Sequence, residues 1–375
     1  MVKIISLHFI LLLTNVCFAS NDTLLFKSTS YFLRTNLHRG FIWAHSASAK
    51  HSENDLVLGL EFELLRKRND TFDTHFNKKG FLTGFGINYF YFDNTILGDN
   101  INAFYTLEST FIKTKKLDLA FKANGGLNFV FNPYNKETNP LNSSYSTYIN
   151  YYLGLGLVAN FKLNDANEIG AKVILNHFSN GGNRNPNLGV NFFTTNISYS
   201  RRIFDNVNKK LDFKKRNGLF ESKNNWQIAA FATYKTSPFA KSDFFWVNGI
   251  GLSYNKPFGK KDAHSLALGL EVITDRAIEY FLIQDNKPNI SHHRIGATIG
   301  HEFLFHRFTW GQYLGVYLFN EIPYFNWIYH RHTIAYKINK NWSMGVSLFA
   351  NNQSANFTDY RVIYRWNREK QIKVE

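Results

Sequence analysis

The sequence contains a single cysteine, Cys17, which lies within the first 19 residues. That leader places Lys3 before an apolar run and ends in the small-residue stretch Cys17-Phe18-Ala19. Such an arrangement is typical of a secretory signal peptide, and we expect cleavage near Ala19. The mature chain then has no thiol, which excludes disulfides, metal–thiolate sites and cysteine nucleophiles.

Long hydrophobic runs are also lacking. After the leader, no segment approaches the roughly 20 consecutive apolar residues that a transmembrane helix needs. The sequence contains no glycine-rich phosphate loop, CxxC pair or HExxH motif, so nucleotide binding and structural zinc have no support. We therefore expect no metal and no organic cofactor. If the protein lies in a membrane, it does not cross it with helices.

Charge and aromatic content narrow the class further. The net charge is +15, the sequence pI is about 9.6, and 17% of the residues are aromatic. A basic balance suits nucleic acid, an anionic membrane surface or an acidic glycolipid. The export signal argues against nucleic acid as a partner. An exported chain without cysteine needs another source of stability, which a closed sheet in lipid provides.

Apolar and polar residues alternate from about residue 40 onward, in segments of roughly 10 residues separated by polar clusters. This pattern is typical of a transmembrane β-barrel. One segment at the C-terminal end shows it clearly, because Tyr360, Val362, Tyr364 and Trp366 share one face while Arg361 and Arg365 take the other. The pattern predicts strands over 40–46, 55–65, 80–92, 117–131, 168–179, 227–236, 264–277 and 359–366.

Loop lengths predict the orientation of these strands. The connections 113–116, 164–167, 258–263 and 339–341 are short, as periplasmic turns are, whereas 132–146 and the segment after Ser179 are long, as outer loops are. Counting from 40–46 as the first upward strand makes 168–179 the seventh. The loops at 66–79 and 204–225 do not fit, because both are long where a short periplasmic turn is expected.

The predicted fold class is all-β, an antiparallel transmembrane β-barrel. We expect a single barrel of about 14–16 strands, with two tandem barrels of about 8 strands each as the alternative. The domain prediction is a signal peptide at 1–19, a barrel half with the active site at 20–203, a basic connector at 204–225 and a second half at 226–375. Residues 345–354 align thinly with 170–179, pairing Asn352 with His177 and Ser354 with Ser179, which leaves open whether the second half is a degenerate copy.

The stretch "NHFSNGGNRNPNLGVN" (176–191) carries the candidate site. Because side chains alternate along a strand, His177 and Ser179 end an apolar column with Val173 and Leu175 that faces lipid. Lys172 and Asn176 then face the interior. In the next strand the same reasoning places Asn191 on the outer face. The three polar side chains therefore meet across one hairpin, near the outer surface.

Chemistry gives this set a role. A serine hydroxyl is a weak nucleophile until a base removes its proton, and the base needs a third group that fixes its tautomer. His177 and Ser179 lie about 6.6 Å apart along the strand, a separation that their side chains can close. Asn180 and the Gly181-Gly182 turn can supply an amide and a backbone N–H to a developing oxyanion. The competing interpretation is an interfacial strand end followed by a glycine turn.

The segments "HFSNGG" and "NPNLGVN" resemble the signature of the lipid A 3-O-deacylase (PagL) family, outer-membrane barrel esterases grouped with acyloxyacyl-hydrolase-like proteins. The resemblance is to a long form, and it extends over 40–46, 96–100, 139–142 and 358–366. It implies that His177 is the base, Ser179 the nucleophile, and Asn180 with Gly182 the oxyanion donors. It also implies a site at outer-leaflet height on the barrel exterior.

One position departs from the family pattern. The best-known members place a glutamate where this chain has Asn191. Asparagine can accept from the imidazole N–H, but it cannot neutralise an imidazolium. The longer members also tend to have asparagine here, so the resemblance implies slower or altered chemistry rather than a loss of activity.

Two functions follow. The first is an outer-membrane serine esterase that removes an ester-linked acyl chain from lipid A or lipopolysaccharide. The second is a catalytically inactive structural or pore-forming barrel. Outer-membrane lipid surrounds the protein in both, and the sequence leaves the oligomeric state open. Six further histidines show no metal-ligand spacing and are predicted to be barrel or interfacial residues: His292, His293, His301, His306, His330 and His332.

Overall fold

The structure is a computed structural model. It describes residues 29–44, 50, 52–68, 81–206, 224–259, 263–305, 307–351 and 354–366. The predicted signal peptide, most of the predicted connector at 204–225, and Asn352 lie outside these ranges, as does His306.

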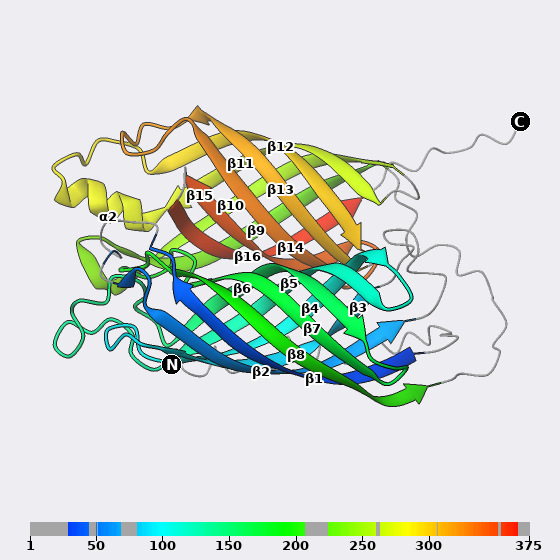
Figure 1. Cartoon of the computed structure of the whole chain (residues 1–375). Coiled ribbons are helices and arrows are strands. Elements are labelled where there is room, and N and C mark those ends of the chain that lie inside the picture. The colour runs from blue at the N-terminus through cyan, green and yellow to red at the C-terminus, as the bar shows by residue number, and fades with distance from the viewer. Residues whose placement is uncertain are drawn as a thin grey trace, which may run out of the picture.

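The first half of the chain forms a closed barrel of eight antiparallel strands (Figure 1). Consecutive strands pair throughout, and the barrel closes because β8 pairs with β1, from Thr29–Asn206 to Ile42–Phe192. The strands are β1 (Thr29–Ile42), β2 (Leu56–Arg68), β3 (Phe81–Phe92), β4 (Asn100–Lys113), β5 (Leu117–Val130), β6 (Ile149–Lys162), β7 (Asn167–Ser179) and β8 (Val190–Asn206).

The second half forms another closed barrel, in which β9 pairs with both β10 and β16. In Figure 1 it lies beside the first barrel. Its elements are β9 (Asn225–Ser237), β10 (Ala240–Phe258), β11 (His264–Asp275), α2 (Arg276–Gln284), β12 (His293–Phe305), β13 (Phe308–Phe319), β14 (Ile328–Lys337), β15 (Trp342–Asn351) and β16 (Ser354–Trp366).

The prediction of an all-β antiparallel barrel protein is confirmed, but the preference for one large barrel is wrong. The alternative of two tandem eight-stranded barrels is the observed architecture. Closure after eight strands gives a lumen that side chains alone can fill. The alternation of residues within each strand is the same for either barrel size, so it does not reveal where the sheet closes.

Two strand predictions also need correction. The first strand was expected at 40–46, whereas β1 begins at Thr29 and ends at Ile42. This shift leaves β7 as the seventh strand. The strand expected at 264–277 ends at Asp275, where α2 begins. The Asp275 side chain accepts a hydrogen bond from the backbone N–H of Ile278, which caps the helix and ends the strand.

Buried charges fill the lumen of the first barrel. Arg34 forms ion pairs with Glu63 at 3.5 Å and Glu108 at 2.5 Å. Lys122 contacts Glu63, and Lys172 lies 3.3 Å from Glu63. These side chains are at most 2% exposed, so the pairing compensates the cost of removing each charge from water.

The lumen of the second barrel contains a corresponding network. Asp275 pairs with Lys235 at 2.7 Å and with Arg294 at 3.1 Å, while Arg331 pairs with Glu271 at 3.1 Å and also with Asp359. Aromatic rings lie against these cations: Phe231, Phe325, Phe349 and Phe357. Filled interiors of this kind favour two plugged barrels over an open channel.

The strand ends divide into a short-turn end and a long-loop end. Residues 114–116, 163–166 and 338–341 connect their strands by short turns, as predicted. The loops 131–148 and 180–189 and the helix α2 lie together at the opposite end (Figure 1). Ser179 therefore ends β7 at the long-loop end. Within the described parts of the chain, no helix is long and apolar enough to cross a membrane.

Candidate active site

The alternation of β7 and β8 places three polar side chains on the outer face of the first barrel. His177 and Ser179 follow the exposed Val173 and the half-buried Leu175, whereas Lys172 and Asn176 are buried in the lumen. His177 lies directly opposite Asn191 in the β7–β8 pairing. The predicted column is therefore formed as the sequence indicates, by the register of one hairpin.

The three side chains form one hydrogen-bonded chain. The Oδ1 atom of Asn191 lies 2.7 Å from Nδ1 of His177, and Nε2 of His177 lies 3.1 Å from Oγ of Ser179. Because the amide oxygen only accepts, Nδ1 carries the proton and Nε2 presents its lone pair to the hydroxyl. This is the tautomer that a general base needs to take the serine proton.

Gly189 fixes the position of the imidazole from the side of the following loop. Its φ is +72°, and a Cβ atom there would lie 2.7 Å from Cε1 of His177 and 3.2 Å from Cβ of Ser179. Only glycine combines this backbone conformation with so close an approach. The ring of His177 is thus held between the loop and Asn191.

The loop after Ser179 carries the predicted oxyanion donors, and its hydrogen bonds show how it is built. The side-chain amide of Asn180 donates to the backbone oxygen of Arg184 at 2.7 Å and to Oγ of Ser146 at 3.3 Å. The N–H of Gly182 donates to Oδ1 of Asn180 at 3.2 Å. The N–H of Gly181 donates to Oγ of Ser179 at 3.4 Å, so within the Gly181-Gly182 turn it is Gly181, and not the Gly182 that the family resemblance implies, whose N–H reaches the serine.

The β5–β6 loop supports this turn from behind. Backbone N–H groups of Leu188 and Gly189 donate to the backbone oxygens of Ser143 and Ser144. Tyr145 is fully buried against Phe178, and its hydroxyl donates to the backbone oxygen of Leu97. Burial raises the pKa of the Tyr145 phenol well above its usual value. The phenol therefore stays neutral and keeps donating this hydrogen bond across the accessible pH range.

The second barrel borders the site, which the sequence did not predict. Tyr151 on β6 lies opposite Ser179 in the pairing, and its hydroxyl is 3.0 Å from that of Tyr360 on β16. Thr358, also on β16, donates to the backbone oxygen of Gly181 at 3.1 Å. Thr358 and Tyr360 both lie in the segment 358–366, which carries part of the family resemblance. That resemblance is the sequence feature that connects the second barrel with the site.

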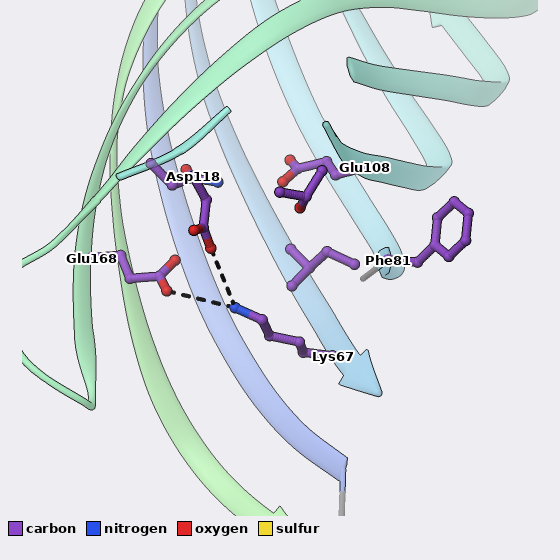
Figure 2. A pocket seen from close by; sticks show the side chains of 8 residues that line it. Lys67, Phe81, Glu108, Asp118 and Glu168 are labelled. Atoms are coloured by element: carbon purple, nitrogen blue, oxygen red, sulfur yellow. Dashed lines mark ion pairs between the residues drawn. The ribbon is translucent and has the colours of Figure 1, made fainter. Parts of the chain in front are cut away.

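A pocket at the opposite end of the first barrel is distinct from this site. Figure 2 shows Lys67 between Asp118 and Glu168, at 3.9 and 4.0 Å. The pocket has a volume of about 20 Å³, which suits a single water molecule and no lipid. Lys67, Asp118 and Glu168 close the lumen of the first barrel at its short-turn end.

The described histidines do not converge on a metal site. His264 and His301 lie 3.2 Å apart, as do His330 and His332 at 3.1 Å, but each is a pair. Among the residues that the structure describes, no group of three or more His, Cys, Asp or Glu side chains is placed to hold a metal ion.

Fold and site together define a class: an outer-membrane β-barrel that carries a serine–histidine–asparagine chain on its outer wall. The family model described as lipid A 3-O-deacylase (PagL) matches residues 21–200. The model described as the C-terminal domain of acyloxyacyl hydrolase matches residues 224–368. The chain belongs to the lipid A 3-O-deacylase (PagL) family of outer-membrane hydrolases, in a two-barrel form.

Two solved structures are similar to this chain at low sequence identity and low TM-score. The crystal structure of the outer membrane enzyme PagL is 15% identical, covers 45% of this chain and 99% of its own, and has a TM-score of 0.32. An engineered porin of Rh. blastica is 9% identical, covers 90% of this chain and 100% of its own, and has a TM-score of 0.19. No curated protein matches the chain.

Proposed function

We propose that this protein is a serine esterase that removes an ester-linked acyl chain from lipid A or lipopolysaccharide in the outer leaflet. The observation that carries the proposal is the continuous contact from Asn191 through His177 to Ser179 on the membrane-facing wall of the first barrel. The lumen of the first barrel also places a histidine beside a hydroxyl and a carboxylate, since His38 lies 3.3 Å from Oγ1 of Thr194 and 3.5 Å from Glu61, but these side chains are at most 4% exposed and are closed to a lipid ester.

The proposed reaction follows from these contacts. Oγ of Ser179 attacks the ester carbonyl carbon while Nε2 of His177 takes the hydroxyl proton. The tetrahedral oxyanion then collapses, and the sugar hydroxyl leaves with that proton. Water then attacks the carbonyl carbon of the acyl-serine while Nε2 of His177 takes a proton from it. Oγ of Ser179 leaves with that proton, and the fatty acid is released. We assign the Gly181 N–H to the oxyanion, because it reaches Oγ of Ser179. The family resemblance implies Asn180 and Gly182 for this role, but their N–H groups bond within the loop instead.

The surroundings of Ser179 suit a lipid substrate. On β6, the outward neighbours of Ser179 and His177 are Tyr151 and Leu153, and Leu155 continues the row toward the membrane centre. An acyl chain beside this row stays in an apolar environment while its ester group reaches the serine. The net charge of +15 suits the phosphorylated headgroup of such a glycolipid.

Mass spectrometry of lipid A tests this function directly. Lipid A from cells that express the wild-type protein is expected to contain a species lighter by one hydroxyacyl or acyl group than lipid A from cells without it. Phospholipids from the same cells serve as the comparison substrate. An unchanged lipid A profile together with lysophospholipid formation would reassign the substrate, and no product in either lipid would contradict the esterase.

The orientation of the site gives a second prediction. The exposed Leu188 lies in the loop beside the site, and Asp165 lies in the turn at the opposite end of β7. With no native thiol in the mature chain, single cysteines label cleanly. A membrane-impermeant maleimide on intact cells is expected to label the Leu188→Cys variant and not the Asp165→Cys variant. The reverse pattern would place the site in the inner leaflet.

A further inference from the structure

The turn that follows the nucleophile is held by the second barrel. Gly181 and Gly182 have φ values of +68° and +84°, and a Cβ at Gly181 would lie 2.1 Å from Oγ1 of Thr358. That hydroxyl donates to the backbone oxygen of Gly181 at 3.1 Å, and Thr358 is only 3% exposed. The second barrel therefore packs directly on Gly181, the residue whose N–H reaches Oγ of Ser179.

Asn183 extends the contact into the wall of the second barrel. Its Nδ2 donates to Oγ1 of Thr233 at 2.7 Å, and to the backbone oxygens of Tyr234 at 2.9 Å and Thr358 at 3.1 Å. Its Oδ1 accepts from the N–H of Thr358 at 2.8 Å. Its backbone oxygen accepts from the N–H of Thr236 at 3.0 Å. One residue of the first barrel thus bonds to both β9 and β16.

The position of Asn183 in the second barrel explains so many bonds. The ladder between β16 and β9 runs from Trp366–Trp226 to Tyr360–Ala232. Thr358, Thr233 and Tyr234 lie just beyond that last pair. The amide of Asn183 bonds to backbone groups of both strands there, so it continues the ladder where strand-to-strand pairing ends.

We propose that the second barrel is a positioning element for the esterase site: Thr358 and Asn183 are positioning residues that hold the Gly181-Gly182 turn so that the N–H of Gly181 faces the oxyanion at Ser179. This inference rests on the proposed function. In this role the second barrel contributes to catalysis but supplies no residue of the triad. Donors that are fixed before the reaction stabilise the oxyanion without a cost of reorganisation, and small displacements of such groups lower the rate strongly.

Substitutions at Thr358 in the full-length protein test the proposal. Thr358→Val keeps the shape of the side chain and removes the hydroxyl, and it is expected to lower kcat by about tenfold with little change in KM, since one hydrogen bond is lost. Thr358→Ser keeps the hydroxyl and is expected to restore most of the rate. Asn183→Ala is expected to lower kcat more than Thr358→Val does, because it removes several hydrogen bonds at once.

The matched control is Thr333→Val. Thr333 is a buried threonine of the same barrel whose hydroxyl donates to Oγ of Ser347 at 2.9 Å, inside the lumen and away from the turn. It is expected to keep the wild-type kcat. Heat-modifiable migration in electrophoresis verifies that each variant contains folded barrels. Equal kcat losses in Thr333→Val and Thr358→Val, or no rescue by Thr358→Ser, would overturn the positioning role.

Hydrogen exchange separates this inference from the proposed function. Amides of residues 181–183 are expected to exchange faster in Thr358→Val and Asn183→Ala than in wild type or Thr333→Val. If wild type lacks esterase activity, the proposed function fails, and faster exchange still supports the hold of the second barrel on the turn. Unchanged exchange, or faster exchange with a wild-type kcat, would overturn the inference.

Discussion

The Ser179→Ala variant is expected to lose deacylation by about a thousandfold or more, because the reaction loses the atom that attacks the ester. The side chain of Ser179 lies on the outer face of β7, and the partners of its Oγ in the described part of the chain, His177 and Gly181, belong to the site itself. The variant is therefore expected to insert and fold as wild type does. The measurement is the initial rate of fatty-acid release from purified lipid A in detergent micelles.

Ser109→Ala provides the matched control. Ser109 is also a serine on the outer face of the first barrel, on β4, and it is expected to keep the wild-type rate. His177→Ala is expected to lose nearly as much as Ser179→Ala, and the double variant no more than either alone, because residues that act as a unit are not additive. A Ser179→Ala variant that keeps half of the activity would remove Ser179 from the mechanism.

The strands of this protein could be predicted from the sequence, because each one shows its two faces in the order of its residues. β7 and β16 illustrate this, since the residues assigned to lumen and lipid lie where alternation places them. Barrel closure could not be predicted in this way. It depends on pairs such as Thr29–Asn206 and Tyr360–Ala232, which join residues far apart in the chain and leave no periodic signal.

The candidate site likewise has one part that the sequence predicts and one part that it does not. His177, Ser179 and Asn191 come from one hairpin, so their alignment follows from period-two alternation and the register of a single turn. The hydrogen bonds between Thr358 and the turn join residues separated by 175 or more positions. Only the docking of two closed barrels brings them together. Residue pattern within a strand carries no information on that contact.

The weak alignment of 345–354 with 170–179 can be compared with the strands of the two barrels. β7 and β15 are each the seventh strand of their barrel in chain order, so residues 345–351 and their aligned residues 170–176 lie on equivalent strands, whereas Ser354 begins β16. The alignment pairs His177 with Asn352, so the second segment has no histidine at the position of the base. An origin of the second barrel as a degenerate copy stays a prediction, and its present role is the positioning proposed above.

Variants of Asn191 distinguish a catalytic site from a strand end that has only a structural role. Its Oδ1 lies 2.7 Å from Nδ1 of His177 and can hold the tautomer, but an amide cannot balance the charge of an imidazolium. Asn191→Leu has a similar volume and no acceptor, so it is expected to lower kcat by about a hundredfold. Thr195→Leu, on the outer face of the same strand, is the control and is expected to keep the wild-type rate.

Asn191→Glu is the sharper variant. A carboxylate opposite His177 both orients the ring and stabilises its protonated form, which develops as Ser179 attacks. The rate is therefore expected to hold or rise, measured as fatty-acid release under the conditions used for wild type. If Asn191→Leu and wild type have equal rates, Asn191 does not orient the base. If wild type releases no fatty acid from lipid A or phospholipid, and Asn191→Glu releases none either, then the outer wall of the first barrel is a structural surface and the protein is a barrel without esterase activity.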